Sequence, residues 1–211
     1  MRRLLALLCI CLFGLNACSS WKGSDETVEA QVLPELSCIA VLPTAVPVES
    51  TGIMLNTELK SLLAGAAYLD SVLAEELAGK EQFHILTDHQ IDGILSDPWG
   101  GRIQQLRAIS KATGCGGVLE TTLSRYRQRV GTKLSAETPA SVSFSMDLVG
   151  VEKGVVLWST SFDETQQALF DNILSFKTAE SRGFKWITAE ELIRKGLQTR
   201  LEAFPYLQKQ E

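Results

Sequence analysis

The sequence has little of the material from which catalytic and metal sites are usually built. Its 211 residues include only two histidines and five cysteines, and Cys9 and Cys11 lie in an N-terminal segment that we expect to be removed. Gly-x-Ser-x-Gly, His-Glu-x-x-His, Cys-x-x-Cys and phosphate-binding Walker motifs are all missing. We therefore predict that the protein is not an enzyme and has no catalytic residue, metal or cofactor.

Positive charge and long apolar segments are also scarce. Twenty basic residues stand against twenty-five acidic ones, and the net charge of −5 argues against a nucleic acid partner. After the N-terminal segment no apolar run reaches the length of about eighteen residues that a membrane-spanning helix needs. A hydrophobic content of 45% is ordinary for a globular protein, and the length suits one folded domain.

The N-terminus has the composition of a secretory signal. Arg2 and Arg3 precede an apolar run from Leu4 to Leu15, which is too short to span a bilayer as a helix. The run ends in Leu-Asn-Ala-Cys18, which resembles the lipobox of bacterial lipoproteins, where the cysteine is acylated after the signal is cut away. We expect residues 1–17 to be a lipoprotein signal peptide and Cys18 to be the lipid attachment site. The alternative is an ordinary signal peptide that leaves Cys18 as a plain thiol.

The predicted lipid anchor indicates where in the cell the protein is located. Ser19 after the cysteine resembles the outer-membrane default of Gram-negative lipoproteins, so we expect a lipid-anchored outer-membrane protein with its domain in the periplasm. Residues 18–36 are polar and lack a sustained period, which is typical of a flexible tether. Residues 37–211 then form the folded domain.

Strands and helices alternate along the first half of this domain. A short apolar run at 38–42 and another at 82–86 predict buried strands. Leucines and alanines spaced by three and four predict a helix over 55–77, which Gly65 divides into two pieces. A capping-box pattern at Thr87 and Gln90 predicts a helix over Ile91 and Leu95, and a further helix runs over 102–113.

The second half turns to a period of two. Residues 118–126 and 142–148 predict strands, and a turn at 152–154 returns the chain as a hairpin strand over 155–162. A capping box at Thr188 and Glu191 starts a last helix with Leu192, Leu197 and Leu201 on its inner face. The order β-α-β-α-β-β-β-α predicts a single two-layer α/β sandwich with a mixed sheet that ends in an antiparallel meander.

Four segments together resemble a known group of proteins. They are Ile39-Ala-Val-Leu-Pro, Gln82-Phe-His-Ile-Leu-Thr, Ala112-Thr-Gly-Cys-Gly-Gly-Val-Leu and Val155-Val-Leu-Trp158. Over about residues 37–162 the pattern is similar to periplasmic lipoproteins of the curli-secretion (CsgG-like) type, penicillin-binding-protein activator lipoproteins and the amino-terminal domain of TolB. The resemblance implies an α/β domain that binds an envelope protein partner.

Few residues suggest a metal-binding or catalytic site. His84 and His89 lie five apart, but no cysteine or third histidine is near them in the sequence, so we interpret them as ordinary strand and helix-start residues. Asp88 and Asp92 are one helical turn apart, where acids usually interact with the helix dipole. The glycines at 114, 116 and 117 are interpreted as a connection between a helix and a strand.

A partner-binding surface is predicted near the C-terminus. Aromatic and basic side chains alternate there, at Phe176, Lys177, Arg182, Phe184, Lys185 and Trp186. Such residues dominate binding hot spots. The alternative is a loop that packs its aromatic rings on the sheet and leaves its charges in water.

A disulfide is predicted between Cys38 and Cys115. Once Cys18 is acylated these are the only thiols left, and the periplasm is oxidising. Both begin predicted strands, and the first and third strands are expected to be parallel neighbours, so their starts come together. The alternative is two buried cysteines that act as small apolar residues.

Three classes of function remain open at this stage. The leading hypothesis is a non-enzymatic envelope lipoprotein that binds a protein partner in cell-wall synthesis, secretion or envelope assembly. The second is a hydrolase of peptidoglycan or another envelope polymer, which paired carboxylates would carry. The third is an oligomeric outer-membrane secretion component, which would need pairs of lipid-facing strands beyond the elements predicted above.

Overall fold

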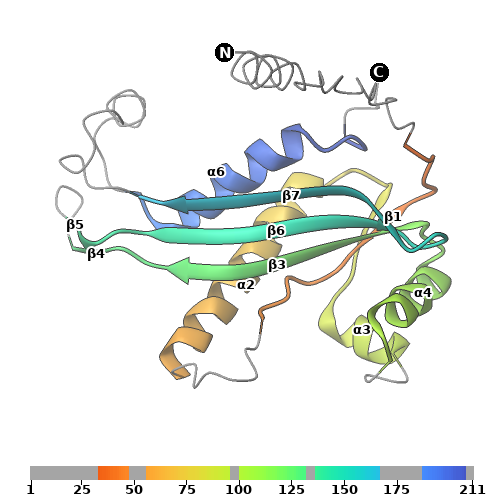
Figure 1. Cartoon of the computed structure of the whole chain (residues 1–211), viewed down its shortest axis with the longest axis horizontal. Helices are drawn as coiled ribbons and strands as arrows, with labels where there is room; N and C mark the ends of the chain where they lie inside the picture. Colours follow the sequence, from red (N-terminus) through yellow and green to blue (C-terminus); the bar gives the residue numbers. More distant parts are fainter. Residues whose placement is uncertain (1–32, 48–55, 96–99, 132–135, 167–186, 208–211) are drawn as a thin grey trace, which may run out of the picture. The chain divides into compact units, whose positions relative to one another are not determined.

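A mixed sheet of five strands organises the domain in the computed structural model, which describes residues 33–47, 56–95, 100–131, 136–166 and 187–207 (Figure 1). The strands of this sheet are β1 (Ile39–Val41), β2 (Phe83–Ile85), β3 (Gly117–Arg127), β6 (Ser141–Gly150) and β7 (Val155–Thr165). The helices are α2 (Asn56–Leu77), α3 (Asp88–Ile94), α4 (Arg102–Thr113) and α6 (Ala189–Glu202). Two short strands, β4 (Val130–Gly131) and β5 (Ala136–Thr138), pair separately.

The strand order is β2-β1-β3-β6-β7. β1 lies between β2 and β3 and is parallel to both, with Ile39 opposite Phe83 on one side and Gly117 on the other. β3, β6 and β7 form an antiparallel meander, in which Phe144 of β6 faces Phe162 of β7. The predicted α/β sandwich with a mixed sheet and the parallel pairing of its first and third strands are both confirmed.

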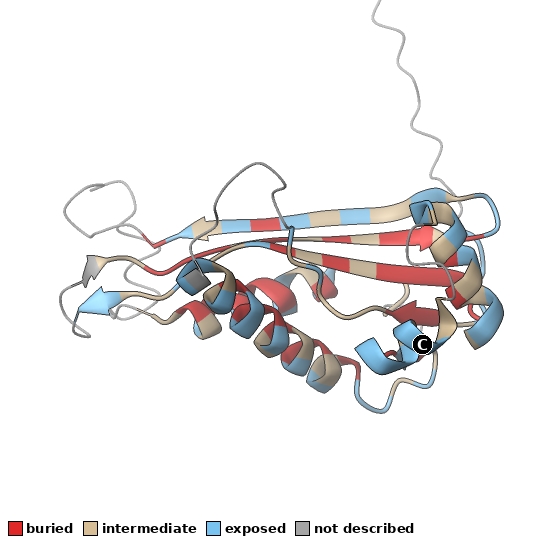
Figure 2. Ribbon diagram, turned by 90° about the horizontal axis from the view of Figure 1, so that it is seen from below, coloured by how far each residue is buried: buried red, intermediate tan, exposed pale blue. Residues whose placement is uncertain are grey.

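The two faces of the sheet bury different helices. Ile39 and Val41 belong to a large core with residues of α2 and α6, whereas Ala40 belongs to a smaller core with Leu106 and Ile109 of α4. The change of face between neighbouring residues follows from the period of two in a strand. Figure 2 shows buried residues along the central strands and on the inner sides of the helices, whereas the edge strand β7 is mostly intermediate or exposed.

Helix ends lie where the capping patterns predict them. The Thr87 side chain accepts from the backbone N–H of Gln90, and Thr188 accepts from that of Glu191; both are complete capping boxes. Gly114 ends α4 in the left-handed conformation, with φ of 75°, as the helix-to-strand connection requires. Among the described residues, no helix is long and apolar enough to cross a membrane.

Three details differ from the sequence prediction. α2 runs through Gly65 without a break, β7 continues to Thr165, and β4 and β5 were not predicted. Gly65 is needed for close packing: a Cβ there would lie 2.5 Å from Cγ of Tyr126. A glycine at a helix-to-sheet contact has the same sequence signature as a helix breaker, and only the packing distinguishes them.

Candidate functional site

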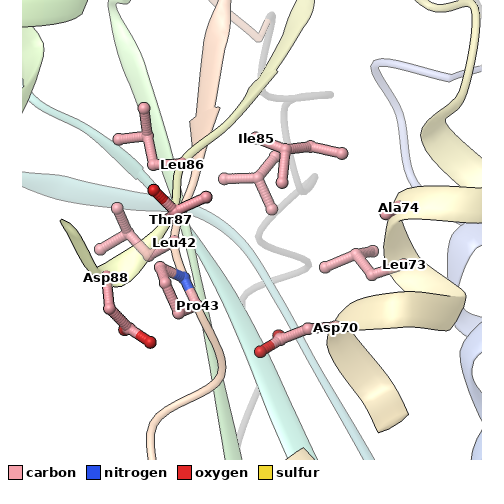
Figure 3. Close-up of a pocket in the computed structure, with 10 residues that line it drawn as sticks. Leu42, Pro43, Asp70, Leu73, Ala74, Ile85, Leu86, Thr87 and Asp88 are labelled. Atoms are coloured by element: carbon pink, nitrogen blue, oxygen red, sulfur yellow. The ribbon is translucent and has the colours of Figure 1, made fainter. Parts of the chain in front are cut away.

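A pocket of about 260 Å³ opens where the carboxyl ends of β1 and β2 meet α2 and the start of α3 (Figure 3). Its walls are mainly aliphatic, with Leu42 and Pro43 after β1, Leu73 of α2 and Ile85 of β2. Ile85, on the edge strand β2, is 44% exposed. The volume is below the range of about 300–1,000 Å³ of small-molecule sites, so it suits one or two side chains.

Local sequence explains why the pocket forms there. Val41 and Ile85 are opposite each other in the parallel pair, so both strands end at the same edge. Pro43 then follows β1, while Thr87 caps α3 immediately after β2. The segments that follow the two strands, Leu42-Pro43 and Leu86-Thr87, then line the pocket together with residues of α2.

Asp70 is the main polar group of the pocket. Its Oδ1 accepts hydrogen bonds from the backbone N–H of Thr44 (2.9 Å) and from the Thr44 hydroxyl (2.5 Å). Burial raises the pKa of Asp70; the two hydrogen bonds lower it in part, and the charge of Asp88 raises it further. Asp70 and Asp88 lie on either side of Pro43, and Figure 3 shows their carboxyl groups directed into the space between.

The arrangement favours a cation next to an apolar group. Two carboxylates that repel each other beside aliphatic walls are stabilised when a positive charge enters between them. Asp88 lies in the first turn of α3, as predicted for a helix-start acid, and the structure also places it at the pocket with Asp70. The sequence gives no signal for Asp70, because it lies within the helix next to Leu69 of the apolar stripe and belongs to no motif.

The two cysteines of the predicted disulfide lie before the amino ends of β1 and β3, away from the pocket. A disulfide joins Cys38 and Cys115, whose Cα atoms are 4.6 Å apart. His84 lies in strand β2, as predicted, and its Nδ1 lies 3.5 Å from Sγ of Cys115. A separation of 31 residues hid this contact. His89 is exposed on α3.

Two predicted sites lie outside the described residues. One is the lipid attachment site Cys18, and the other is the partner-binding surface at 176–186. Trp158 of β7 is partly buried and packs edge-on against Phe204 at a centroid distance of 4.7 Å.

Comparison with known proteins gives similarity in structure alone. No protein-family model matches the sequence, and no curated protein matches it. The PelC dodecamer of Paraburkholderia phytofirmans is 15% identical, with 76% of this chain and 84% of that chain covered and a TM-score of 0.38. Lipoprotein GNA1162 of Neisseria meningitidis is 18% identical, with coverages of 70% and 98% and a TM-score of 0.40. The C-terminal domain of LpoB from Escherichia coli is 16% identical, with coverages of 62% and 84% and a TM-score of 0.34.

These values do not establish a common function. Structures of LpoB and of a Neisseria lipoprotein are among those similar to this chain, at identities below 25%. The predicted likenesses to the curli-secretion protein and to TolB find no support in them. A function for this chain therefore has to be argued from its own residues.

Proposed function

We propose that the chain is a non-enzymatic, lipid-anchored envelope protein whose domain binds a protein partner in cell-wall synthesis, secretion or envelope assembly. Cys18 attaches it to the outer membrane, and the tether over 18–36 carries residues 37–211 into the periplasm. The pocket beside Asp70 and Asp88 receives an apolar side chain of the partner together with a neighbouring lysine or arginine.

The observation that carries this proposal is the composition of the pocket. Leu42, Leu73 and Ile85 offer aliphatic contact, and Asp70 and Asp88 offer negative charge at the same opening. The complementary ligand is amphipathic and basic, which is the character of a protein segment with arginine or lysine beside a large apolar residue. Partial burial strengthens such a charge pair relative to one on an open surface.

A second candidate function has one specific observation in its favour. A carboxyl group with a raised pKa, such as Asp70, beside another carboxylate is the pattern of a glycoside hydrolase. The pocket is small and mainly aliphatic, which suits a polysaccharide chain poorly. Solubilisation of labelled peptidoglycan by the purified protein, lost in Asp70→Asn and Asp88→Asn, would favour the hydrolase.

The anchor is tested by Cys18→Ala. The parent should incorporate labelled palmitate and fractionate with the outer membrane, because two or more acyl chains give stable attachment. The variant should lose the label and remain uncleaved or mislocalised. Continued labelling of the variant, together with membrane fractionation, would contradict lipidation at Cys18.

The docking site is tested by site-specific photo-crosslinking in intact cells. A photoreactive residue at Ile85 should give one discrete adduct, and the adduct should weaken when Asp88→Asn removes a charge from the pocket. Val155 on β7 is the matched control, since it is 46% exposed against 44% for Ile85 and lies on the other edge strand. The segment of the partner that is crosslinked should contain lysine or arginine.

Two results would overturn this docking site. One is an equal yield of the same adduct from Ile85 and Val155, which would mean that crosslinking follows exposure alone. The other is an Ile85 adduct that is unaffected by neutralising Asp88 and Asp70.

A further inference from the structure

Three side chains with metal-binding atoms come together at the amino end of β1, away from the pocket. Cys38 directly precedes β1, Cys115 lies two residues before β3, and His84 is in β2. The two cysteine Sγ atoms and an imidazole nitrogen of His84 all lie within 4.8 Å of one another. The sequence separates Cys38 from Cys115 by 77 residues, so only the order β2-β1-β3 brings the three together.

The strand register explains why these side chains share one face. Ile39 and Val41 face the core formed with α2 and α6, so Cys38 and Ala40 face the core beneath α4. His84 is opposite Ala40 in the parallel pair and therefore shares this face. Cys115 is buried in the same small core, at 1% exposure.

The backbone holds the cysteines in place independently of the disulfide. The carbonyl of Cys115 accepts from the Ser110 hydroxyl (2.7 Å), and its N–H donates to Oγ1 of Thr113 (3.3 Å). The carbonyl of Cys38 accepts from the N–H of Gly117 (3.3 Å). His84 is exposed, so one side of the cluster is open to solvent. The cluster is thus supported by the sheet and α4, with access for a small ion.

We propose that Cys38, Cys115 and His84 bind one thiophilic d¹⁰ cation, Zn²⁺ or Cu⁺, when the disulfide is reduced. Bond lengths of about 2.3 Å to sulfur and about 2.0 Å to nitrogen place the ligand atoms of a tetrahedral site about 3.5–3.8 Å apart. Sγ of Cys115 and Nδ1 of His84 are already 3.5 Å apart. Water supplies the fourth position of a zinc ion on the exposed side.

Loading of the site requires a reductant and releases protons. A dithiol transfers two electrons and two protons to the Cys38–Cys115 disulfide and becomes a cyclic disulfide itself. The cation then binds both sulfurs as thiolates, which releases the two thiol protons, while the neutral imidazole gives its nitrogen lone pair. The same sulfurs cannot form the disulfide and bind the metal, so binding depends on the redox state.

The test uses the full chain with Cys9, Cys11 and Cys18 replaced by serine, so that only two thiols remain. After reduction with dithiothreitol and anaerobic removal of the reductant, Co²⁺ serves as a spectroscopic probe. We expect one Co²⁺ per chain, with a thiolate-to-cobalt charge-transfer band that Zn²⁺ abolishes. The oxidised chain should show no such band. Equimolar Zn²⁺ and Cu⁺, followed by elemental analysis, identifies which ion the site takes.

Variants distinguish this site from incidental binding to thiols. His84→Ala should weaken Co²⁺ binding by about tenfold or more, since it removes one of three protein ligands. His89→Ala is the matched control and should bind as the parent does. Thiol titration first confirms that the reduced chain has two free thiols. If this chain then gives no charge-transfer band with Co²⁺, the proposal is overturned, whether circular dichroism shows the chain folded or unfolded. It is also overturned if His84→Ala binds Co²⁺ as tightly as the parent.

Discussion

At the scale of single residues, two glycines allow helices to approach the sheet closely. A Cβ at Gly65 of α2 would lie 2.5 Å from the Tyr126 ring of β3. A Cβ at Gly196 of α6 would lie 2.8 Å from the Phe162 ring of β7. Both glycines are buried inside helices, where glycine is otherwise a poor choice. The opposing aromatic ring therefore explains why each position has no side chain.

Substitution at Gly65 tests this interpretation. Alanine should raise helix propensity by about 1 kcal/mol, yet overpacking against Tyr126 should cost about 1–3 kcal/mol. We therefore expect Gly65→Ala to lower the free energy of unfolding measured in urea. Gly93→Ala in α3 is the control, because nothing lies within 4 Å of its added Cβ, and it should be neutral or stabilising. Equal effects of the two substitutions would show that the contact with Tyr126 is unimportant.

Glu190 lies in a small polar network between β3 and α6. Its carboxylate accepts from the Tyr126 hydroxyl (2.8 Å) and from the Gln128 amide, while Gln128 Oε1 accepts from the N–H of Ala189 (3.2 Å). Burial alone would raise the pKa of Glu190, but these hydrogen bonds outweigh it and hold the pKa below the ordinary value of 4.5. The pKa of Tyr126 is raised by burial and by Glu190.

The pH dependence of stability follows from this shift. Because the pKa of Glu190 is lower in the folded state, its contribution is present above pH 4.5 and is lost as pH falls through the folded pKa. Glu190→Gln should therefore lose stability relative to the parent at neutral pH, with the difference shrinking below pH 4.5. Urea titrations across this range measure the difference.

Asp70 provides a control of opposite sign. Its pKa is raised, chiefly by burial, so its contribution to stability is present at low pH and is lost as pH rises through the folded pKa. The stability of the parent relative to Asp70→Asn should therefore grow on acidification. The same pH trend in both variants would contradict the assigned shifts.

At the scale of elements, α6 joins the sheet through a fully buried face. Leu192, Ile193 and Leu197 have 0% exposure. The helix starts at a capping box in which Oγ1 of Thr188 accepts from the N–H of Glu191 (3.2 Å). Its exposed ion pair between Arg194 and Glu75 (2.8 Å) contributes little in water. Apolar burial and the cap therefore account for its stability.

The two contributions to α6 can be separated by substitution. Leu197→Ala should lower the free energy of unfolding by about 2–5 kcal/mol through a cavity, and Thr188→Ala by about 1 kcal/mol through loss of the cap. Thr199→Ala, on the exposed side, should change it by less than about 0.5 kcal/mol. If deletion of residues 188–211 left the melting temperature unchanged, α6 would not belong to the core.

At the scale of the whole domain, the Cys38–Cys115 link closes a loop of sequence separation 77. This loop contains β1, α2, β2, α3 and α4, so the bond restricts the unfolded chain over nearly half of the domain's length. In the chain-entropy description a loop of this length stabilises by about 4 kcal/mol.

Thiol counting tests the link directly. The mature protein, denatured without reductant, should have no free thiol, and reduction should release two. The double variant Cys38→Ser, Cys115→Ser should unfold at a lower urea concentration than the parent. Its free energy of unfolding should be lower by up to about 4 kcal/mol. Two free thiols in the unreduced protein would contradict the bond.

Much of the fold follows from local patterns. The periods of two and 3.6 place β3, β6, β7 and the helices, and the side-chain caps at Thr87 and Thr188 fix where α3 and α6 begin. The parallel orientation of β1, β2 and β3 also follows, because each strand-helix-strand connection joins strands that run in the same direction. The periods and the caps depend on residues within a few positions of one another.

The sequence by itself determined the order of elements, the helix caps and the signature of an N-terminal lipid anchor. Only the tertiary structure decided that Asp70 shares a pocket with Asp88, that His84 lies beside Cys115, and that Gly65 faces Tyr126. The physical reason is that periodicity states which face of an element is buried but not which residue lies opposite it. Opposing residues are set by strand order and register, and these emerge only when the whole core packs.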